Sequence, residues 1–184
     1  MEKIKHPHYE KKIIIAKCNK KGDILGGIER WEAHKKGILH RAFTVAIVYK
    51  NKFLIQHRKH PVFDGALDIT SSSHQLYENG KLQDTIEATF MTLKREWNIE
   101  KKDLLKQPKD LGTIYYKAKD KFSIYTEHEV CNIVVCEVKK LPSPNLDFAY
   151  GYSMASKKEL SNTSSRIFAQ IVPWVQTMIK ENKL

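Results

Sequence analysis

Residues 40–58 read HRAFTVAIVYKNKFLIQHR, and this stretch decides the fold class that we expect. Within His40–Tyr49 the side chains alternate around small and β-branched positions, which predicts a strand. Asn51-Lys52 then predicts a tight turn into a second strand over Phe53–His57. The stretch therefore predicts a β-hairpin, and the other elements are placed around it.

Strands and helices on both sides of this hairpin complete the expected fold. Further strands are predicted at Ile13–Ala16, Ala66–Thr70, Ile114–Lys119, Phe122–Thr126 and Val130–Val138. A helix is predicted at Ile28–Lys36, ended by Gly37, and another at Ile86–Trp97, capped by Asp84 or Thr85 and closed by Asn98. Two more helices are predicted, one from Ser156 to Leu160 and one at Arg166–Asn182 with Pro173 in its first turns. The order of elements favours an α+β fold or an α/β/α sandwich over a doubly wound parallel sheet.

The composition is that of an ordinary soluble globular protein. The 184 residues are 41% hydrophobic and 29% charged, which favours a single domain with one core. No apolar run is long enough to cross a bilayer, and the polar stretch Met1–Lys12 lacks the apolar segment of a secretion signal. Cys18, Cys131 and Cys136 have neither zinc nor redox-motif spacing. We therefore expect reduced thiols, a cytoplasmic location and no membrane partner.

The formal net charge of +11 has two readings. The lysines are scattered, mostly at the ends of elements, which favours a solvated basic surface. A small anionic ligand such as a diphosphate is the alternative. Nucleic acid is not favoured as a partner, since there is no RNP-like aromatic pair, zinc finger or basic tail. The sequence does not predict an oligomeric state.

Glu127 and Glu129 carry the first chemical signal. They lie two residues apart at the start of an apolar strand, so their side chains point to the same face. Two like charges on one face repel unless a cation or a proton lies between them. His34, His40 and His74 add nitrogen donors, and such a mixed set suits Zn²⁺, Mn²⁺ or Mg²⁺. A solvated carboxylate pair and ordinary surface or capping histidines are the alternative, because spacing alone does not show that these residues meet.

Five short motifs, taken in order, resemble one family. They are WEAH with LHRAF at 31–43, FLIQHR at 53–58, GALDIT at 65–70, SSH at 72–74 and EHEV at 127–130. Together they resemble the type I isopentenyl-diphosphate isomerases of the Nudix superfamily, over about residues 28–138. The resemblance implies a Nudix-type α/β/α sandwich with a mixed sheet. It places the core at about residues 28–160 and a C-terminal helix at about residues 166–182.

The resemblance also implies a set of site residues. The metal ligands would be His34, His40, His74, Glu127 and Glu129, with Glu96 holding a second ion, Mg²⁺, together with substrate phosphate. The catalytic residues would be Ser72, Glu129 and Tyr116. Arg30, Arg58 and Lys59 would contact the diphosphate. The reaction implied is the interconversion of isopentenyl and dimethylallyl diphosphate by protonation and deprotonation.

The chain departs from the family at three positions. Ser72 replaces the catalytic cysteine, and an alcohol ionises far less readily than a thiol. A positioned acid or base is typically worth about 10²–10⁴ in rate, so this change predicts a slow enzyme. The aromatic residue that shields the carbocation has no clear match, with Ala169 nearest to its position. An arginine on the helix is replaced by Thr92.

Two alternatives therefore stand beside the isomerase. The first is a Nudix diphosphohydrolase acting on a nucleoside or isoprenoid diphosphate. Against it, the helix segment 91–96 keeps only Glu96 of the acidic set that such hydrolases need. The second is a non-catalytic protein that binds a metal and a diphosphate, since both catalytic signatures are incomplete while the metal ligands survive.

Overall fold

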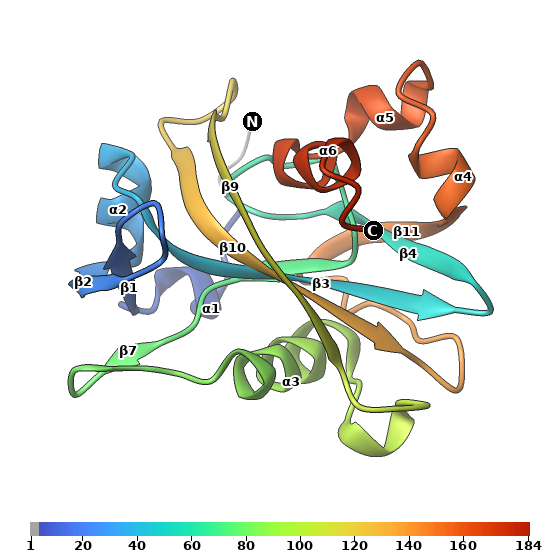
Figure 1. Cartoon of the computed structure of the whole chain (residues 1–184), viewed down its shortest axis with the longest axis horizontal. Coiled ribbons are helices and arrows are strands. Elements are labelled where there is room, and N and C mark those ends of the chain that lie inside the picture. Colours follow the sequence, from blue (N-terminus) through green and yellow to red (C-terminus); the bar gives the residue numbers. More distant parts are fainter. Residues whose placement is uncertain (1–3) are drawn as a thin grey trace.

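A mixed sheet covered by helices on both faces forms the centre of the computed structural model (Figure 1), which describes residues 4–184. The first three residues of the polar stretch 1–12 lie outside the described part. The nine strands of the main sheet are β1 (Ile14–Cys18), β2 (Ile24–Glu29), β3 (His40–Tyr49), β4 (Lys52–Arg58), β5 (Leu67–Asp68), β6 (Ser71–Ser73), β9 (Lys109–Lys119), β10 (Thr126–Glu137) and β11 (Ala149–Ser156). A separate short hairpin joins β7 (Tyr77–Glu78) and β8 (Lys81–Leu82).

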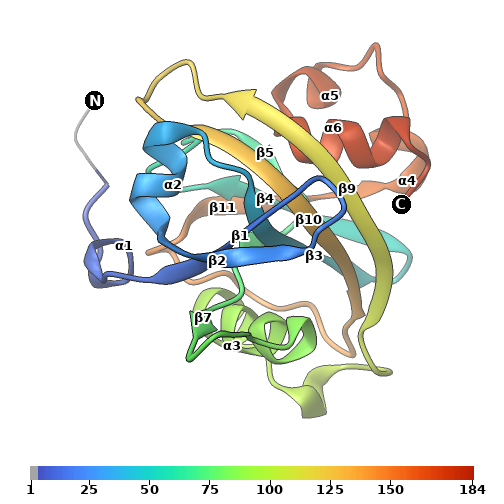
Figure 2. The ribbon, with the colours of Figure 1, turned by 60° about the vertical axis from the view of Figure 1, so that its left-hand side comes forward.

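The helices are short except for one. They are α1 (Pro7–Glu10), α2 (Arg30–Lys36), α3 (Thr85–Trp97), α4 (Lys157–Leu160), α5 (Arg166–Gln170) and α6 (Pro173–Lys180), with a 3₁₀ turn at Lys101–Asp103. Figure 1 shows α3 on one side of the sheet and α4, α5 and α6 on the other, and Figure 2 shows α2 beside the β1–β2 edge. No helix in the described range is long and apolar enough to cross a membrane.

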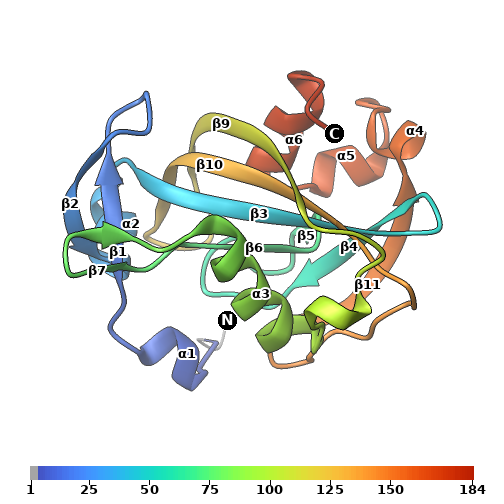
Figure 3. The same cartoon turned by 60° about the horizontal axis from the view of Figure 1, so that its bottom comes forward.

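Alternation along the central strand β3 builds a separate core on each face. Ala42 and Ala46 belong to the cluster that contains Trp174 of α6, whereas Phe43 belongs to the cluster that contains Trp97 of α3. Successive strand residues point to opposite faces, so one strand can serve both layers. Figure 3 shows the sheet between these helices. The expected α/β/α sandwich with a mixed sheet is confirmed, since β3 and β10 are parallel while the other paired strands are antiparallel.

The predicted ends of two helices match the structure. Asp84 caps α3 by accepting hydrogen bonds from the N–H groups of Ile86 and Glu87. Asn98 ends α3 in the left-handed region at φ 52°, and Gly37 ends α2 in the same way at φ 61°.

The expected C-terminal helix over residues 166–182 is wrong as a single element. The chain forms α5 and α6, with Ile171 and Val172 extended between them. The residue before a proline is disfavoured in the helical region, and Pro173 is well suited to the first turn of a new helix. The break at Pro173 turns α6 onto the sheet, where it packs along β9.

Two strand predictions also need correction, and two strands of the sheet were missed. Residues 122–125 form a bend between β9 and β10, where Asp120 accepts a hydrogen bond from the Phe122 N–H. The expected strand over 66–70 is only Leu67–Asp68, and Thr70 has φ 100° before β6 begins. The strands β2 and β11 were not predicted, and β1 with β2 extends the sheet to residues before the expected core start at 28.

Candidate functional site

Strand register brings three chemically important side chains to one position on the sheet. Glu129 of β10 pairs with His40 of β3 on one side and with Tyr116 of β9 on the other. Directly paired residues project from the same face, so these three side chains form a row. Glu127 lies two residues earlier on the same face of β10, and His74 follows the short strand β6 that pairs with β3.

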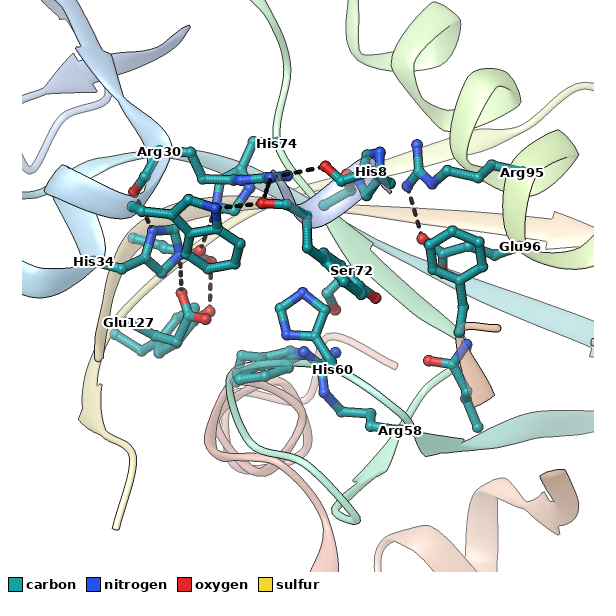
Figure 4. A pocket seen from close by; sticks show the side chains of 18 residues that line it. His8, Arg30, His34, Arg58, His60, Ser72, His74, Arg95, Glu96 and Glu127 are labelled. Atoms are coloured by element: carbon teal, nitrogen blue, oxygen red, sulfur yellow. Dashed lines mark hydrogen bonds and ion pairs between the residues drawn. The ribbon is translucent and has the colours of Figure 1, made fainter. Parts of the chain in front are cut away.

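Five of the expected ligands form what we call the His/Glu cluster. It consists of His34, His40, His74, Glu127 and Glu129, whose donor atoms all lie within 4.8 Å of one another. His34 Nε2 is 3.1 Å from Glu127 Oε2, while His40 Nε2 and His74 Nε2 are 3.4 and 3.2 Å from Glu129 Oε1. His34 comes from helix α2 and not from the sheet (Figure 4).

Two features of the cluster fit a divalent cation. The Nδ1 atoms of His34 and His40 lie 2.6 and 2.7 Å from the carbonyl oxygens of Arg30 and Ile38, so each Nδ1 carries the proton. A cation would displace the Nε2 proton of each ring, and the Nε2 lone pairs would then face the cluster. Glu127 Oε2 is buried and makes no directed hydrogen bond, although it lies close to His34. Converging imidazole nitrogens and a buried unsatisfied carboxylate oxygen favour a cation, and three nitrogens with carboxylates suit Zn²⁺ or Mn²⁺.

Electrostatics keep Tyr116 protonated and Glu129 ionised. Burial raises the pKa of the Tyr116 phenol well above its usual value, and the negative charge of Glu129 raises it further. Burial also opposes ionisation of Glu129, but hydrogen bonding and charge from His40 outweigh it, so the pKa of this carboxyl is lowered. The phenol donates a short hydrogen bond to Glu129 Oε2. The pair is therefore a proton donor held against a carboxylate.

A small cavity of about 40 Å³ adjoins the cluster (Figure 4). Its wall includes Arg30, Arg58 and Arg95, and each of these guanidinium groups has a buried Nε without a hydrogen-bond partner. Three guanidinium groups around one cavity favour an anionic ligand. A second cavity of about 240 Å³ shares Arg30 and Arg95 with the first, so the two cavities meet at these side chains.

Most of the sequence-predicted site residues meet here. The cavity is lined by Arg30, His34, Arg58, Ser72, His74, Glu96, Tyr116, Glu127 and Glu129, and His40 lies behind them in the cluster. Glu96 is in the cavity wall but outside the cluster, and its Oε1 lies 2.7 Å from Arg95 Nη2. Lys59 is not brought to the cavity, since its Nζ donates to the carbonyl of Leu146.

Two functional candidates were missed by the sequence reasoning. Arg95 supplies a cation one turn after Thr92, the position where the family arginine was expected, and its Nη2 lies 3.3 Å from Thr92 Oγ1. Trp174, rather than the exposed Ala169, brings an aromatic ring from the C-terminal helices to the cavity, with its ring centroid 5.7 Å from that of Tyr116. The signal that could have found Trp174 is Pro173, which ends the assumed continuous helix.

The comparisons with known proteins concern the fold. No family model matches the chain, and no curated protein matches it by sequence. A solved structure from Deinococcus radiodurans aligns with a TM-score of 0.67 at 16% identity, covering 91% of this chain and 98% of the other. A MutT Nudix hydrolase from Burkholderia pseudomallei aligns at 0.56 and 14%, covering 77% and 96%. A bifunctional NMN adenylyltransferase/ADP ribose pyrophosphatase from Francisella tularensis aligns at 0.51 and 14%, covering 78% of this chain and 41% of the other. The chain therefore has the fold of the Nudix hydrolases.

Proposed function

We propose that this protein is a metal-dependent enzyme acting on a small organic diphosphate, and that it interconverts isopentenyl and dimethylallyl diphosphate. One observation carries the proposal. A single small cavity joins the His/Glu cluster, the Tyr116–Glu129 pair and three arginines with unpartnered Nε atoms.

The arginines would hold the diphosphate. Arg30 and Arg95 stand where the two cavities meet, and their guanidinium groups would bind phosphate oxygens by charge-assisted hydrogen bonds. Arg58 is paired with Asp68 at 2.6 Å and Arg95 with Glu96 at 2.7 Å, so among the described residues Arg30 is the cavity arginine without a carboxylate partner. A divalent ion at the cluster would fix the orientation of Glu129, and Mg²⁺ at Glu96 would neutralise phosphate charge.

The remaining residues suit proton transfer to and from a hydrocarbon. Tyr116 and Glu129 provide a protonated phenol and a carboxylate on the sheet face of the cavity. The ring of Trp174 lies beside Tyr116 and carries the Arg58 guanidinium over its face at 5.1 Å. A π face of this kind stabilises a desolvated positive charge by about 2 kcal/mol. Ser72 also lines the cavity and would act as the second proton-transfer partner.

A diphosphohydrolase is the second candidate, and the comparisons favour it. Two of the structures with this fold are described as a Nudix hydrolase and an ADP ribose pyrophosphatase. The adjoining 240 Å³ cavity offers room for a larger group such as a nucleoside. Against hydrolysis, Glu96 is the one carboxylate that α3 presents to the cavity, since Glu87 of the same helix is exposed to solvent. Hydrolysis with several ions needs more carboxylates than this helix provides.

A paired assay separates these candidates. Metal-analysed protein is incubated with isopentenyl diphosphate, and dimethylallyl diphosphate and free phosphate are followed together. UDP is assayed in parallel by free phosphate, and ADP-ribose by the AMP and ribose 5-phosphate that its hydrolysis yields. The isomerase proposal expects isomer formation that Glu129→Gln abolishes, Ser72→Cys increases and Glu181→Gln, a surface control, leaves unchanged. Phosphate release without isomer supports the hydrolase. No product in either channel, with metal and diphosphate bound, identifies a binding protein.

A further inference from the structure

Asp68 lies directly behind the cavity wall, and the sequence assigned it no role. Its side chain is fully buried, and it contacts three residues that line the cavity. Oδ2 accepts hydrogen bonds from Arg58 Nη1 at 2.6 Å and from Ser72 Oγ at 2.9 Å. Oδ1 accepts hydrogen bonds from Trp174 Nε1 at 3.0 Å and from the Ile69 N–H at 2.8 Å. One carboxylate therefore holds the alcohol, the indole and a guanidinium of the proposed site.

These contacts fix the direction of the hydrogen bond made by Ser72. A carboxylate paired with an arginine only accepts, so the single hydroxyl hydrogen of Ser72 points to Asp68. Thr44 Oγ1 lies 2.5 Å from Ser72 Oγ, and a hydrogen must lie between these two oxygens. Since Ser72 has already used its hydrogen, Thr44 donates to Ser72 in this shorter contact rather than to the Ser71 carbonyl oxygen, which lies 3.4 Å from Thr44 Oγ1. Ser72 can then offer only a lone pair to the cavity.

We infer that Asp68 is a positioning residue that fixes Ser72 as a hydrogen-bond acceptor toward the substrate, so that Ser72 receives the proton that the substrate loses. The inference rests on the proposed isomerase function. In this step a substrate C–H bond breaks and its electron pair forms the new double bond. The proton forms an O–H bond with Ser72 Oγ while the original hydroxyl proton moves to Asp68 Oδ2. Tyr116 with Glu129 would supply the proton that the alkene gains.

The arrangement also explains how serine can stand at this position. An isolated alcohol is a poor proton acceptor because a second proton leaves it with a positive charge. A carboxylate that takes the first proton removes this difficulty, because Ser72 then never carries two protons. A purely structural Asp68, which only neutralises buried Arg58, does not require this hydrogen-bond direction.

The hydrogen bond is tested first without any turnover. In Ser72→Cys protein, infrared spectroscopy measures the S–H stretching band of the introduced thiol, with wild-type protein subtracted to remove the three native thiols. We expect a lower S–H frequency with Asp68 than with Asp68→Asn, because the carboxylate is the stronger acceptor. Identical bands would overturn the inference, whether or not the protein is an enzyme.

Asp68→Asn leaves Arg58 buried without its partner, and such a change can prevent folding. The same infrared comparison is therefore made between Ser72→Cys protein and Ser72→Cys protein that carries both Asp68→Asn and Arg58→Met, so that neither protein holds one partner of this buried pair without the other. A lower S–H frequency in the protein that keeps Asp68 supports the inference, and equal bands contradict it.

A kinetic cycle then tests the role of Asp68 in isomerisation. We expect Asp68→Asn to lower kcat by about 10²-fold with little change in KM, in line with the loss of one positioned proton acceptor. In Ser72→Ala protein, the same change should cost nothing further. Equal losses in both backgrounds would show that Asp68 acts only on the structure. Absence of isomer from wild-type protein would refute the proposed function, while the infrared result still decides the hydrogen bond.

Discussion

His34 makes the metal-free protein sensitive to pH. Burial alone would lower the pKa of His34, but the negative charge of nearby Glu127 raises it from 6.5 to about 9. The folded state therefore binds a proton more tightly than the unfolded state. This stabilisation is complete below pH 6.5 and is lost as the pH rises through about 9.

The size of the effect follows from the shift. A change from 6.5 to about 9, at 1.36 kcal/mol per pKa unit, corresponds to about 3 kcal/mol of unfolding free energy. The lowered pKa of His74, which burial causes first and nearby His34 second, acts in the opposite direction and below pH 6.5. The two histidines therefore act in separate pH ranges.

The assay is urea denaturation of chelator-treated protein at several pH values between 6.5 and about 8, because burial raises the pKa of the Cys18, Cys131 and Cys136 thiols and these would add a separate decline at higher pH. We expect the unfolding free energy to fall across this range in wild type and in His57→Gln, a matched control outside the cluster. In His34→Gln the decline should disappear, because glutamine does not titrate. With metal bound the decline should also disappear, since the ligated ring carries no proton on Nε2. A decline of the same size in His34→Gln would refute the reasoning.

Three further predictions concern the ligand, the metal and the aromatic wall. Arg95→Gln should weaken binding of inorganic diphosphate by about 10–100-fold, as expected for loss of a charge-assisted hydrogen bond. Calorimetry measures the affinity, and the exposed control Arg166→Gln should leave it unchanged. Glu127→Gln should lower the affinity for Zn²⁺ or Mn²⁺ more than about 10-fold in a competition assay with a chelating dye, and unchanged affinity would exclude Glu127 as a ligand. Trp174→Ala should reduce the unfolding free energy by about 3–5 kcal/mol, since the indole is 1% exposed. Trp174→Phe should keep most of the stability but lower the rate of isomer formation. A rate equal to that of wild type would remove the indole from the proposed mechanism.

Local sequence patterns determined the elements that depend on local chemistry. The alternation in His40–Tyr49 and the caps of α3 at Asp84 and Asn98 were predicted correctly, because side-chain direction and capping involve neighbours within a few residues. The same spacing rule placed Glu127 and Glu129 on one face. The prediction of one continuous C-terminal helix failed because the helix break that Pro173 signals was not used.

The meeting of the site residues was decided only by tertiary structure. The parallel register of β10 with β3 places Glu129 beside His40 across 89 positions of chain, and no local pattern encodes such a register. Arg95 of α3 and Trp174 of α6 both line the cavity, although these two helices pack on opposite faces of the sheet. Asp68 gained its partners in the same way, from residues 4, 10 and 106 positions distant. The sequence determined which donors and acceptors were available, and long-range packing determined which of them share one cavity, because those distances depend on the whole sheet.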